Sequence, residues 1–206
     1  MKLNLGCGDR VIEGWTNVDY ALGARLSRVP LFRAVNRRLG IFSVDWDKRI
    51  VLHDLTTRFP WPDSSVEVVY SSHTLEHFTK EHGRAFLAEC YRVLRPRGII
   101  RIVVPDLRVS VEDYLEGRVR ADDFVRTLDV LPIHAASASK NRLARFTQLA
   151  HTHKCMYDTK RLLEILDEVG FTATGRGAFD SDIDDICAIE RESRTRNAVV
   201  VEGRKR

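Results

Sequence analysis

The sequence lacks the features that would assign it at once to several common classes of protein. Its four cysteines are widely separated and form no C-x-x-C pair, so neither a zinc site nor a disulfide framework is indicated. No apolar run approaches the roughly 20 residues that a membrane-spanning helix needs. The first strand pattern begins at Lys2, which leaves no place for a signal peptide. We therefore expect a cytoplasmic protein without a membrane span.

Length and composition fit one ordinary globular domain. The chain has 206 residues, enough for a sizeable core, and 44% of them are hydrophobic and 30% charged. A net charge of +4 permits an acidic partner without requiring one. No internal repeat and no domain boundary is visible. We expect a single domain over residues 1–206, with a homodimer as an open alternative.

The most informative stretch lies at the beginning of the chain. Leu3 and Leu5 alternate with polar residues and lead into Gly6 and Gly8, which predicts a short strand and a turn where the backbone approaches a ligand. Asp19 ends a second predicted strand. A carboxylate at that position can accept two hydrogen bonds from a ribose diol. The pattern therefore indicates a nucleoside-bearing cofactor.

The missing third glycine argues against a dinucleotide. Val11 stands where a Gly-x-Gly-x-x-Gly fingerprint needs glycine, and only Gly6 to Trp15 separate the two strands, which leaves little room for a phosphate-binding helix. S-adenosylmethionine carries no phosphate and needs no such helix. Here the chain resembles the class I, Rossmann-like S-adenosylmethionine-dependent methyltransferases, in particular the methyltransferase type 11 branch, whose first strand reads like LNLGCG and whose second ends in NVD. It departs from them at Asn4, where many members carry an acidic residue.

Further segments of the first half carry the same resemblance. Residues 49–55 read as a strand that includes Asp54, and residues 59–70 resemble the family's LPF-x-D-x-SFD-x-V segment. A helix from Lys80, a Pro-Arg-Gly turn and a strand over 99–104 follow. The resemblance implies an α/β, Rossmann-like fold with a mostly parallel seven-stranded sheet, an antiparallel last strand and helices on both faces.

The rest of the chain is less diagnostic. Residues 21–47 predict a basic helical insertion of one or two short helices, broken at Pro30 and ended at Gly40. Residues 107–158 predict a substrate-side cap or loop region. The remaining predicted elements are helices over 110–115, 121–131 and 159–169, a loop over 133–149, a final strand pair over 171–179 and 197–202, and a frayed tail over 203–206.

The resemblance also implies which residues hold the cofactor. Asp54 and Leu55 would face the adenine, and the residues after the fourth strand would lie near the methyl donor. The implied set is Gly6, Gly8, Asp19, Asp54, Leu55, Ser71 and Ser72.

Methyl transfer to a hydroxyl also requires a group that takes the hydroxyl proton. Histidine is suited to this because its unperturbed pKa lies near 6.5. His73 follows the predicted fourth strand, and His151 and His153 lie on a late loop. These three are the candidate catalytic residues, each with a structural role as the alternative.

The segment His73-x-x-Glu76-His77 suggests a second chemistry. If it begins a helix, spacings of three and four place the three side chains on one face, where they could hold a divalent cation. Similar E-x-x-E-H patterns bind a metal in some O-methyltransferases acting on ubiquinone precursors or small RNAs, although His73 departs from the first position of that pattern. The alternative is that Glu76 and His77 only orient the helix.

The acceptor follows from the resemblance alone. No Asn/Asp-Pro-Pro-Tyr stretch for methylating a nucleobase amino group is present, and no Pro-Cys or Thr-Cys pair for attack on a pyrimidine. The resemblance implies O-methylation of a sugar, polysaccharide or secondary-metabolite hydroxyl, and so a small-molecule or oligosaccharide substrate. Two alternatives stay open: methylation of RNA or a ribosomal component, and a non-catalytic methyltransferase-like subunit.

Overall fold

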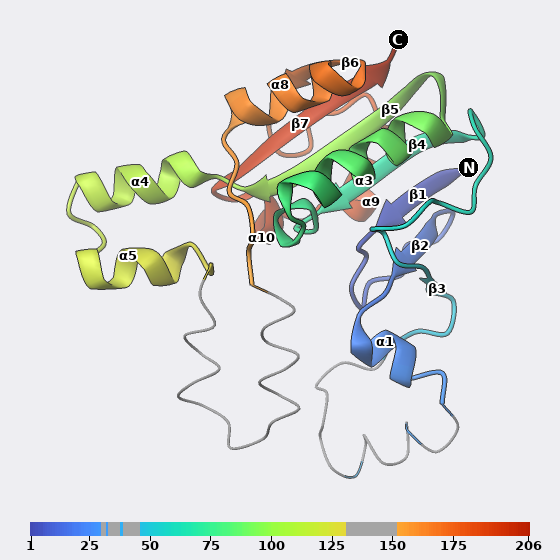
Figure 1. Ribbon diagram of the computed structural model, residues 1–206, viewed down its shortest axis with the longest axis horizontal. Coiled ribbons are helices and arrows are strands. Elements are labelled where there is room, and N and C mark those ends of the chain that lie inside the picture. Colours follow the sequence, from blue (N-terminus) through green and yellow to red (C-terminus); the bar gives the residue numbers. More distant parts are fainter. Residues whose placement is uncertain (30–31, 33–37, 39–45, 131–151) are drawn as a thin grey trace.

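The computed structural model describes the chain except residues 30–31, 33–37, 39–45 and 131–151. A seven-stranded sheet runs through it in the order β3-β2-β1-β4-β5-β7-β6 (Figure 1). Strands β3 to β5 pair in parallel, and β7 pairs antiparallel with β5 and β6. The strands are β1 Lys2–Leu5, β2 Thr16–Asp19, β3 Val51–Leu52, β4 Val66–Ser72, β5 Leu94–Pro105, β6 Phe171–Gly175 and β7 Ala198–Lys205. The predicted fold is confirmed.

Helices cover both faces of the sheet. Two long helices, α3 and α8, lie across the near face in Figure 1, and the short helix α9 lies behind the sheet. The described helices are α1 Leu22–Leu26, the 3-10 helix η1 Leu75–His77, α3 Lys80–Val93, α4 Leu107–Leu115, α5 Ala121–Thr127, α8 Thr159–Val169, α9 Ile186–Ile189 and α10 Glu192–Thr195.

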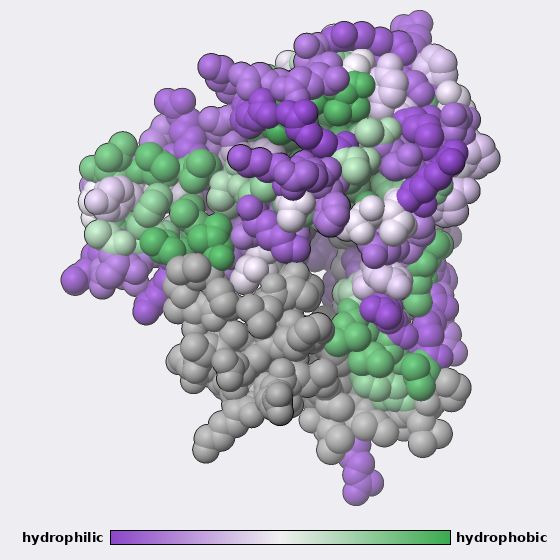
Figure 2. Space-filling model, viewed as in Figure 1, coloured by the Kyte–Doolittle hydropathy of each residue, from purple (hydrophilic) through white to green (hydrophobic). Residues whose placement is uncertain are grey.

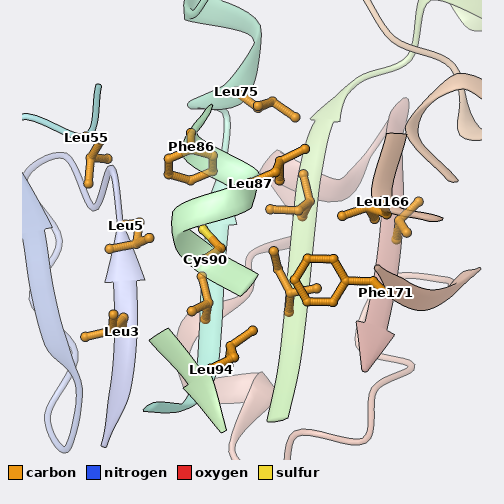
Figure 3. Close-up of a cluster of buried hydrophobic side chains, with 14 of the residues drawn as sticks. Leu3, Leu5, Leu55, Leu75, Phe86, Leu87, Cys90, Leu94, Leu166 and Phe171 are labelled. Carbon is orange, nitrogen blue, oxygen red and sulfur yellow. The ribbon is translucent and has the colours of Figure 1, made fainter. Parts of the chain in front are cut away.

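The main core lies between the sheet and the helices α3 and α8. Leu3 and Leu5 point from β1 toward Phe86 and Leu87 of α3, and Phe171 of β6 closes the far end (Figure 3). All five side chains are at most 1% exposed. Fully burying one such side chain contributes roughly 1.5–3 kcal/mol. The core therefore fixes β1 inside the sheet, next to the middle strand β4.

Helix α8 begins and ends as the sequence predicts. The Asp158 side chain accepts a hydrogen bond from Arg161 N at 2.7 Å, which caps the first turn. Gly170 ends the helix in the left-handed conformation, with φ of +119°. Leu162, Ile165 and Leu166 lie on the buried face.

Four strand predictions need correction. The strand predicted over 171–179 ends at Gly175. The strand predicted over 49–55 is only the two residues of β3, because it is an edge strand that pairs with β2 alone. Strand β5 begins at Leu94, earlier than predicted, since Leu94 pairs with Val66. The predicted frayed tail is wrong: β7 continues to Lys205, which pairs with Phe171, because this strand lies between two neighbours.

Two helix predictions also need correction. Helix α4 begins at Leu107 and is capped by Asp106, whose side chain accepts from Arg108 N, and Ser110 lies inside the helix. Helix α5 ends at Thr127, before the predicted end. The loop predicted over 133–149 lies outside the described residues, as do the predicted break at Pro30 and end at Gly40. The predicted division of the chain into a domain with two inserted regions remains a prediction.

Helices α4 and α5 project from the sheet. Neither contains a buried residue, and they touch through Tyr114 and Phe124, whose ring centroids are 5.1 Å apart. Figure 2 shows apolar side chains gathered over this pair. Leu115 of α4 is 74% exposed. No helix in the described part of the chain has the length and apolar character needed to cross a membrane.

A buried arginine organises the far side of the sheet. Arg101 of β5 is 0% exposed, and its guanidinium contacts Glu190 at 2.8 and 2.9 Å and Glu202 at 3.1 Å. It also donates to the carbonyl oxygens of Asp180 and Gly177. Burial alone would lower the pKa of Arg101, but the neighbouring carboxylates raise it. This network fixes the connection that leads from β6 to α10.

We expect Arg101→Met to lower the free energy of unfolding by about 3–5 kcal/mol, because it leaves two buried carboxylates without their cation. The matched control is Arg161→Met, which removes an exposed partner of Glu164 and Glu168 and should cost less than about 1 kcal/mol. Urea unfolding followed by circular dichroism measures both. Equal costs for the two variants would contradict a stabilising role for the buried network.

Candidate functional site

One pocket of about 830 Å³ opens where β1, β2 and β4 end. Because these strands are parallel neighbours, their carboxyl ends meet at one edge of the sheet, as in other open α/β sheets. Residues from each strand end line the pocket, among them Gly6, Asp19 and Ser72.

The glycine loop takes its shape from two left-handed residues. Gly6 and Gly8 have φ of +72° and +61°. The backbone nitrogens of Gly6 and Cys7 both donate to Val18 O, at 2.9 and 3.0 Å, which holds the loop against β2. A Cβ at Gly6 would lie 2.0 Å from Thr74 Oγ1, whereas one at Gly8 would meet nothing within 4 Å. Gly6 is therefore required for close packing, and Gly8 for its backbone conformation.

The Asp19 carboxylate is fixed in the same wall. Its Oδ2 accepts from Gly8 N at 2.8 Å, and its Oδ1 accepts from Ala21 N at 2.7 Å. These bonds use one lone pair of each oxygen and orient the carboxylate toward the edge of the pocket. The glycine loop and Asp19, which the sequence predicts to be neighbours, are thus in direct contact.

The residues after β3 complete this end of the pocket. Asp54 and Leu55 both line it. Leu55 is 7% exposed and belongs to the main core, so its position is rigid. Asp54 Oδ1 accepts from the backbone nitrogen and the hydroxyl of Thr56, at 2.9 and 2.7 Å. One Asp54 oxygen is therefore used within its own turn.

The two serines that end β4 differ in whether they line the pocket. Ser72 lines the pocket, whereas Ser71 does not and is only 1% exposed. Successive side chains of a strand point to opposite faces, so the two could not both face the cofactor edge. A contact of Ser71 with the cofactor remains a prediction that its burial does not favour. Thr74, which the sequence did not single out, lines the pocket beside Gly6.

Burial makes the Cys7 thiol inert. Desolvation and the Asp19 charge raise the pKa of Cys7 to about 12. The thiol is protonated at neutral pH, and a thiol reacts through its thiolate. Cys7 acts as a small residue of the loop.

His73 is held in an unusual conformation. Its φ is +53°, in the left-handed region. Its backbone nitrogen donates to Val103 O, and its Nε2 lies 2.8 Å from Arg194 O. A carbonyl oxygen only accepts, so Nε2 carries a proton, and Nδ1 lies 3.3 Å from Glu76 Oε1. His73 therefore lines the pocket with its ring held between a backbone carbonyl and a carboxylate.

A second group comes together in the same pocket from distant parts of the chain. Glu76, His77 and His153 all line the pocket, and one ligand atom of each lies within 4.8 Å of the others. The rings of His77 and His153 are 5.1 Å apart between centroids. The predicted helix over 73–77 is instead the 3-10 helix η1, preceded by His73, and the third member of the group is His153. His151 lies outside the described residues.

Two arginines that the sequence did not single out also line the pocket. Arg10 follows the glycine loop and donates through NH2 to Ala188 O at 2.8 Å, and Arg191 lies just beyond α9. Arg10 NH1 is buried and has no hydrogen-bond partner among the described residues. Desolvation and the charge of Arg191 lower the pKa of Arg10. This side of the pocket is suited to an anion.

Comparison with known proteins finds similarity to methyltransferases. A family model described as a methyltransferase domain, of type 11, matches residues 3–102. A probable S-adenosylmethionine-dependent methyltransferase of Mycolicibacterium smegmatis is 36% identical over 56 residues, which are 27% of this chain and 21% of that protein. The match therefore spans about a fifth of the length of that relative.

Solved structures share the fold at low sequence identity. The YcgJ protein of Bacillus subtilis has a TM-score of 0.51 at 13% identity, over 100% of this chain and 91% of that one. An S-adenosylmethionine-dependent methyltransferase of Archaeoglobus fulgidus has a TM-score of 0.51 at 16% identity, over 99% and 85%. The family match, which includes the glycine loop and strands β1 to β4, supports a class I S-adenosylmethionine-dependent methyltransferase, and the solved structures share its fold.

Proposed function

We propose that the protein transfers the methyl group of S-adenosylmethionine to a hydroxyl of a sugar or another small-molecule acceptor. One observation carries the proposal: a single pocket joins the loop of Gly6, Gly8 and Asp19 to the group of Glu76, His77 and His153. A methyl donor held at the first end would lie in the same enclosure as groups that handle a proton. Alignment of this kind supplies a large part of the rate of an in-line displacement.

The cofactor is placed by the residues at the strand ends. Asp19 accepts hydrogen bonds from the ribose diol, and Leu55 packs against the adenine. The Asp54 oxygen that does not bond Thr56 accepts from the adenine amino group. Ser72 lies at the methyl-donor end, with Gly6 and Gly8 allowing the close approach of the backbone.

The anion-accepting side of the pocket receives the carboxylate of the methionine part. Arg10 NH1 is buried without a partner among the described residues, and an anion would satisfy it and offset the repulsion from Arg191. A hydrogen bond to a charged group contributes about 1.5–3 kcal/mol. The carboxylate is the anionic group of the cofactor.

The chemical step is a displacement at carbon. The acceptor hydroxyl loses its proton at the group of Glu76, His77 and His153, and its oxygen forms a bond to the methyl carbon. The bond between that carbon and the sulfonium sulfur breaks, and its electron pair stays on sulfur, which gives neutral S-adenosylhomocysteine. His153 is the favoured proton acceptor because its Nδ1 bonds Leu128 O and leaves Nε2 with the lone pair. His73 is assigned to positioning Glu76, and the role of His151 stays a prediction.

A nucleic-acid acceptor is the second candidate. Arg191, Arg194 and Lys154 line the pocket and are exposed, so a phosphate backbone could approach its mouth. Neutralising phosphates releases counterions, which makes such binding weaken steeply with salt. A third alternative, a non-catalytic subunit, predicts that no cofactor binds.

Asp19→Asn should weaken binding of S-adenosylhomocysteine by about 10–100-fold, because the amide loses an acceptor for the ribose and directs an N–H group toward a backbone N–H. Calorimetric titration of the purified protein measures the dissociation constant. Asp9→Asn is the matched control, since Asp9 lines the same pocket on the same loop and is exposed.

Equal affinity for the cofactor in both Asp variants would overturn the assignment of Asp19. A folded wild-type protein that does not bind S-adenosylhomocysteine would overturn the enzymatic proposal and favour the non-catalytic subunit. A thermal unfolding curve of each variant shows whether the loop still folds.

Short single-stranded RNA should bind weakly to the protein, with little dependence on salt, if the acceptor is a small molecule. Fluorescence anisotropy of a labelled oligonucleotide, measured at low and physiological ionic strength with and without S-adenosylhomocysteine, tests this. Affinity that is high at low salt and falls by about 10³-fold or more as salt rises would favour the nucleic-acid acceptor.

A further inference from the structure

The buried carboxylate of Glu76 has fewer partners than a buried charge requires. The side chain is 0% exposed, and neither of its oxygens has a hydrogen-bond partner among the described residues. Taking an ionised carboxylate out of water without a partner is strongly unfavourable. Glu76 also lines the pocket, so the missing partner can reach it from there.

Two imidazoles face the same point. Ligand atoms of His77 and His153 lie within 4.8 Å of each other and of a Glu76 oxygen. That spacing is suited to three donors around one ion, because metal ligands at about 2.0–2.2 Å from a centre lie a few Å apart. The donors come from two segments, η1 and the residues that precede α8.

Backbone carbonyls select the tautomers of both rings. His153 Nδ1 lies 2.8 Å from Leu128 O, and His77 Nδ1 lies 3.3 Å from Thr152 O. Since a carbonyl accepts, each Nδ1 carries the proton and each Nε2 carries the lone pair. A histidine that binds a metal commonly donates its other N–H to a carbonyl or carboxylate in this way.

The backbone holds the two segments together independently of the side chains. Glu76 O accepts from Lys154 N at 2.7 Å and from Cys155 N at 3.1 Å, and His153 N donates to Asp129 O at 2.9 Å. The ligand positions are therefore preorganised, which a metal site requires.

His73 satisfies at most half of the carboxylate. Its Nδ1 lies 3.3 Å from Glu76 Oε1, an ion pair when His73 is protonated, and its Nε2 is already bonded to Arg194 O. The contact lies outside hydrogen-bond geometry and reaches one oxygen, and Oε2 has no partner among the described residues.

We propose that Glu76, His77 and His153 bind one divalent first-row transition-metal ion of the Zn²⁺ type. Two imidazoles and one carboxylate suit Zn²⁺ or Co²⁺, whereas Mg²⁺ prefers a shell of oxygen ligands. The proposal that the ion binds depends only on the geometry of these three side chains. The role of the ion rests on the proposed function: with the ion bound, His153 is a ligand instead of the proton acceptor, and the ion would hold the acceptor oxygen and favour loss of its proton to water.

Cobalt provides a direct test because Co²⁺ bound to such ligands absorbs visible light. Chelator-treated, metal-free protein is titrated with Co²⁺, and the absorbance and heat of binding are recorded without cofactor or acceptor. We expect one ion per chain, displacement by Zn²⁺, and no comparable binding of Mg²⁺. Glu76→Gln and His153→Ala should each weaken Co²⁺ binding by more than about 100-fold, since losing an outer partner of a ligand already costs about 10–100-fold.

The matched control is His82→Ala, which removes an exposed histidine of the same pocket outside the group and should bind Co²⁺ like the wild type. Absence of stoichiometric Co²⁺ binding in the wild type would overturn the proposal. So would equal binding in His153→Ala and His82→Ala, which would indicate adventitious surface binding. If the Glu76→Gln variant does not fold, the variants His77→Ala and His153→Ala, at half-buried positions, test the proposal instead. Binding of S-adenosylhomocysteine to the same metal-free sample separates failure of the metal site from failure of the methyltransferase assignment.

Discussion

The position of β1 inside the sheet is the constraint on which the site depends. This strand pairs in parallel with β2 on one side and β4 on the other, with Leu3 opposite both Thr16 and Val69. Three strand ends therefore reach one edge together, and the turn after β1 has to pass between its neighbours. Gly6 fits there only because it has no side chain, since any Cβ would collide with Thr74. The open edge that results is the floor of the pocket.

Features that depend on local sequence could be predicted. Three such features lie within the first 19 residues: the alternation in β1, the two left-handed glycines, and the carboxylate at the end of β2. Their residue types determine how they are arranged. The same holds for α8, where a capping aspartate and a terminal glycine mark both ends. The prediction of a frayed tail was wrong at the carboxyl end. Gly203 and Arg204 show no apolar alternation, yet they pair with both β5 and β6 because β7 lies inside the sheet.

Features that depend on distant contacts could not be read from the sequence. His153 lies beside Glu76 because the next two residues, Lys154 and Cys155, donate to Glu76 O from more than 70 residues away, and no local pattern encodes that contact. Arg191 reaches the pocket because the buried network around Arg101 holds the preceding chain, so its position follows from a strand on the other side of the sheet. The difference between Ser71 and Ser72 was available from strand alternation, once the end of β4 was known.

The two ends of the pocket are built from different parts of the chain. The floor of the pocket is formed by the backbone at the ends of the first strands, where Gly6, Asp19 and Thr74 constrain one another. The wall formed by Glu76, His77 and His153 depends on two backbone hydrogen bonds. Glu76 O accepts from Lys154 N and Cys155 N, which join η1 to the region leading into α8. Substitutions in that later region can reshape the wall without disturbing the floor. Relatives with the same floor can thus diverge in the molecules they accept, and acceptor preference can evolve faster than cofactor use.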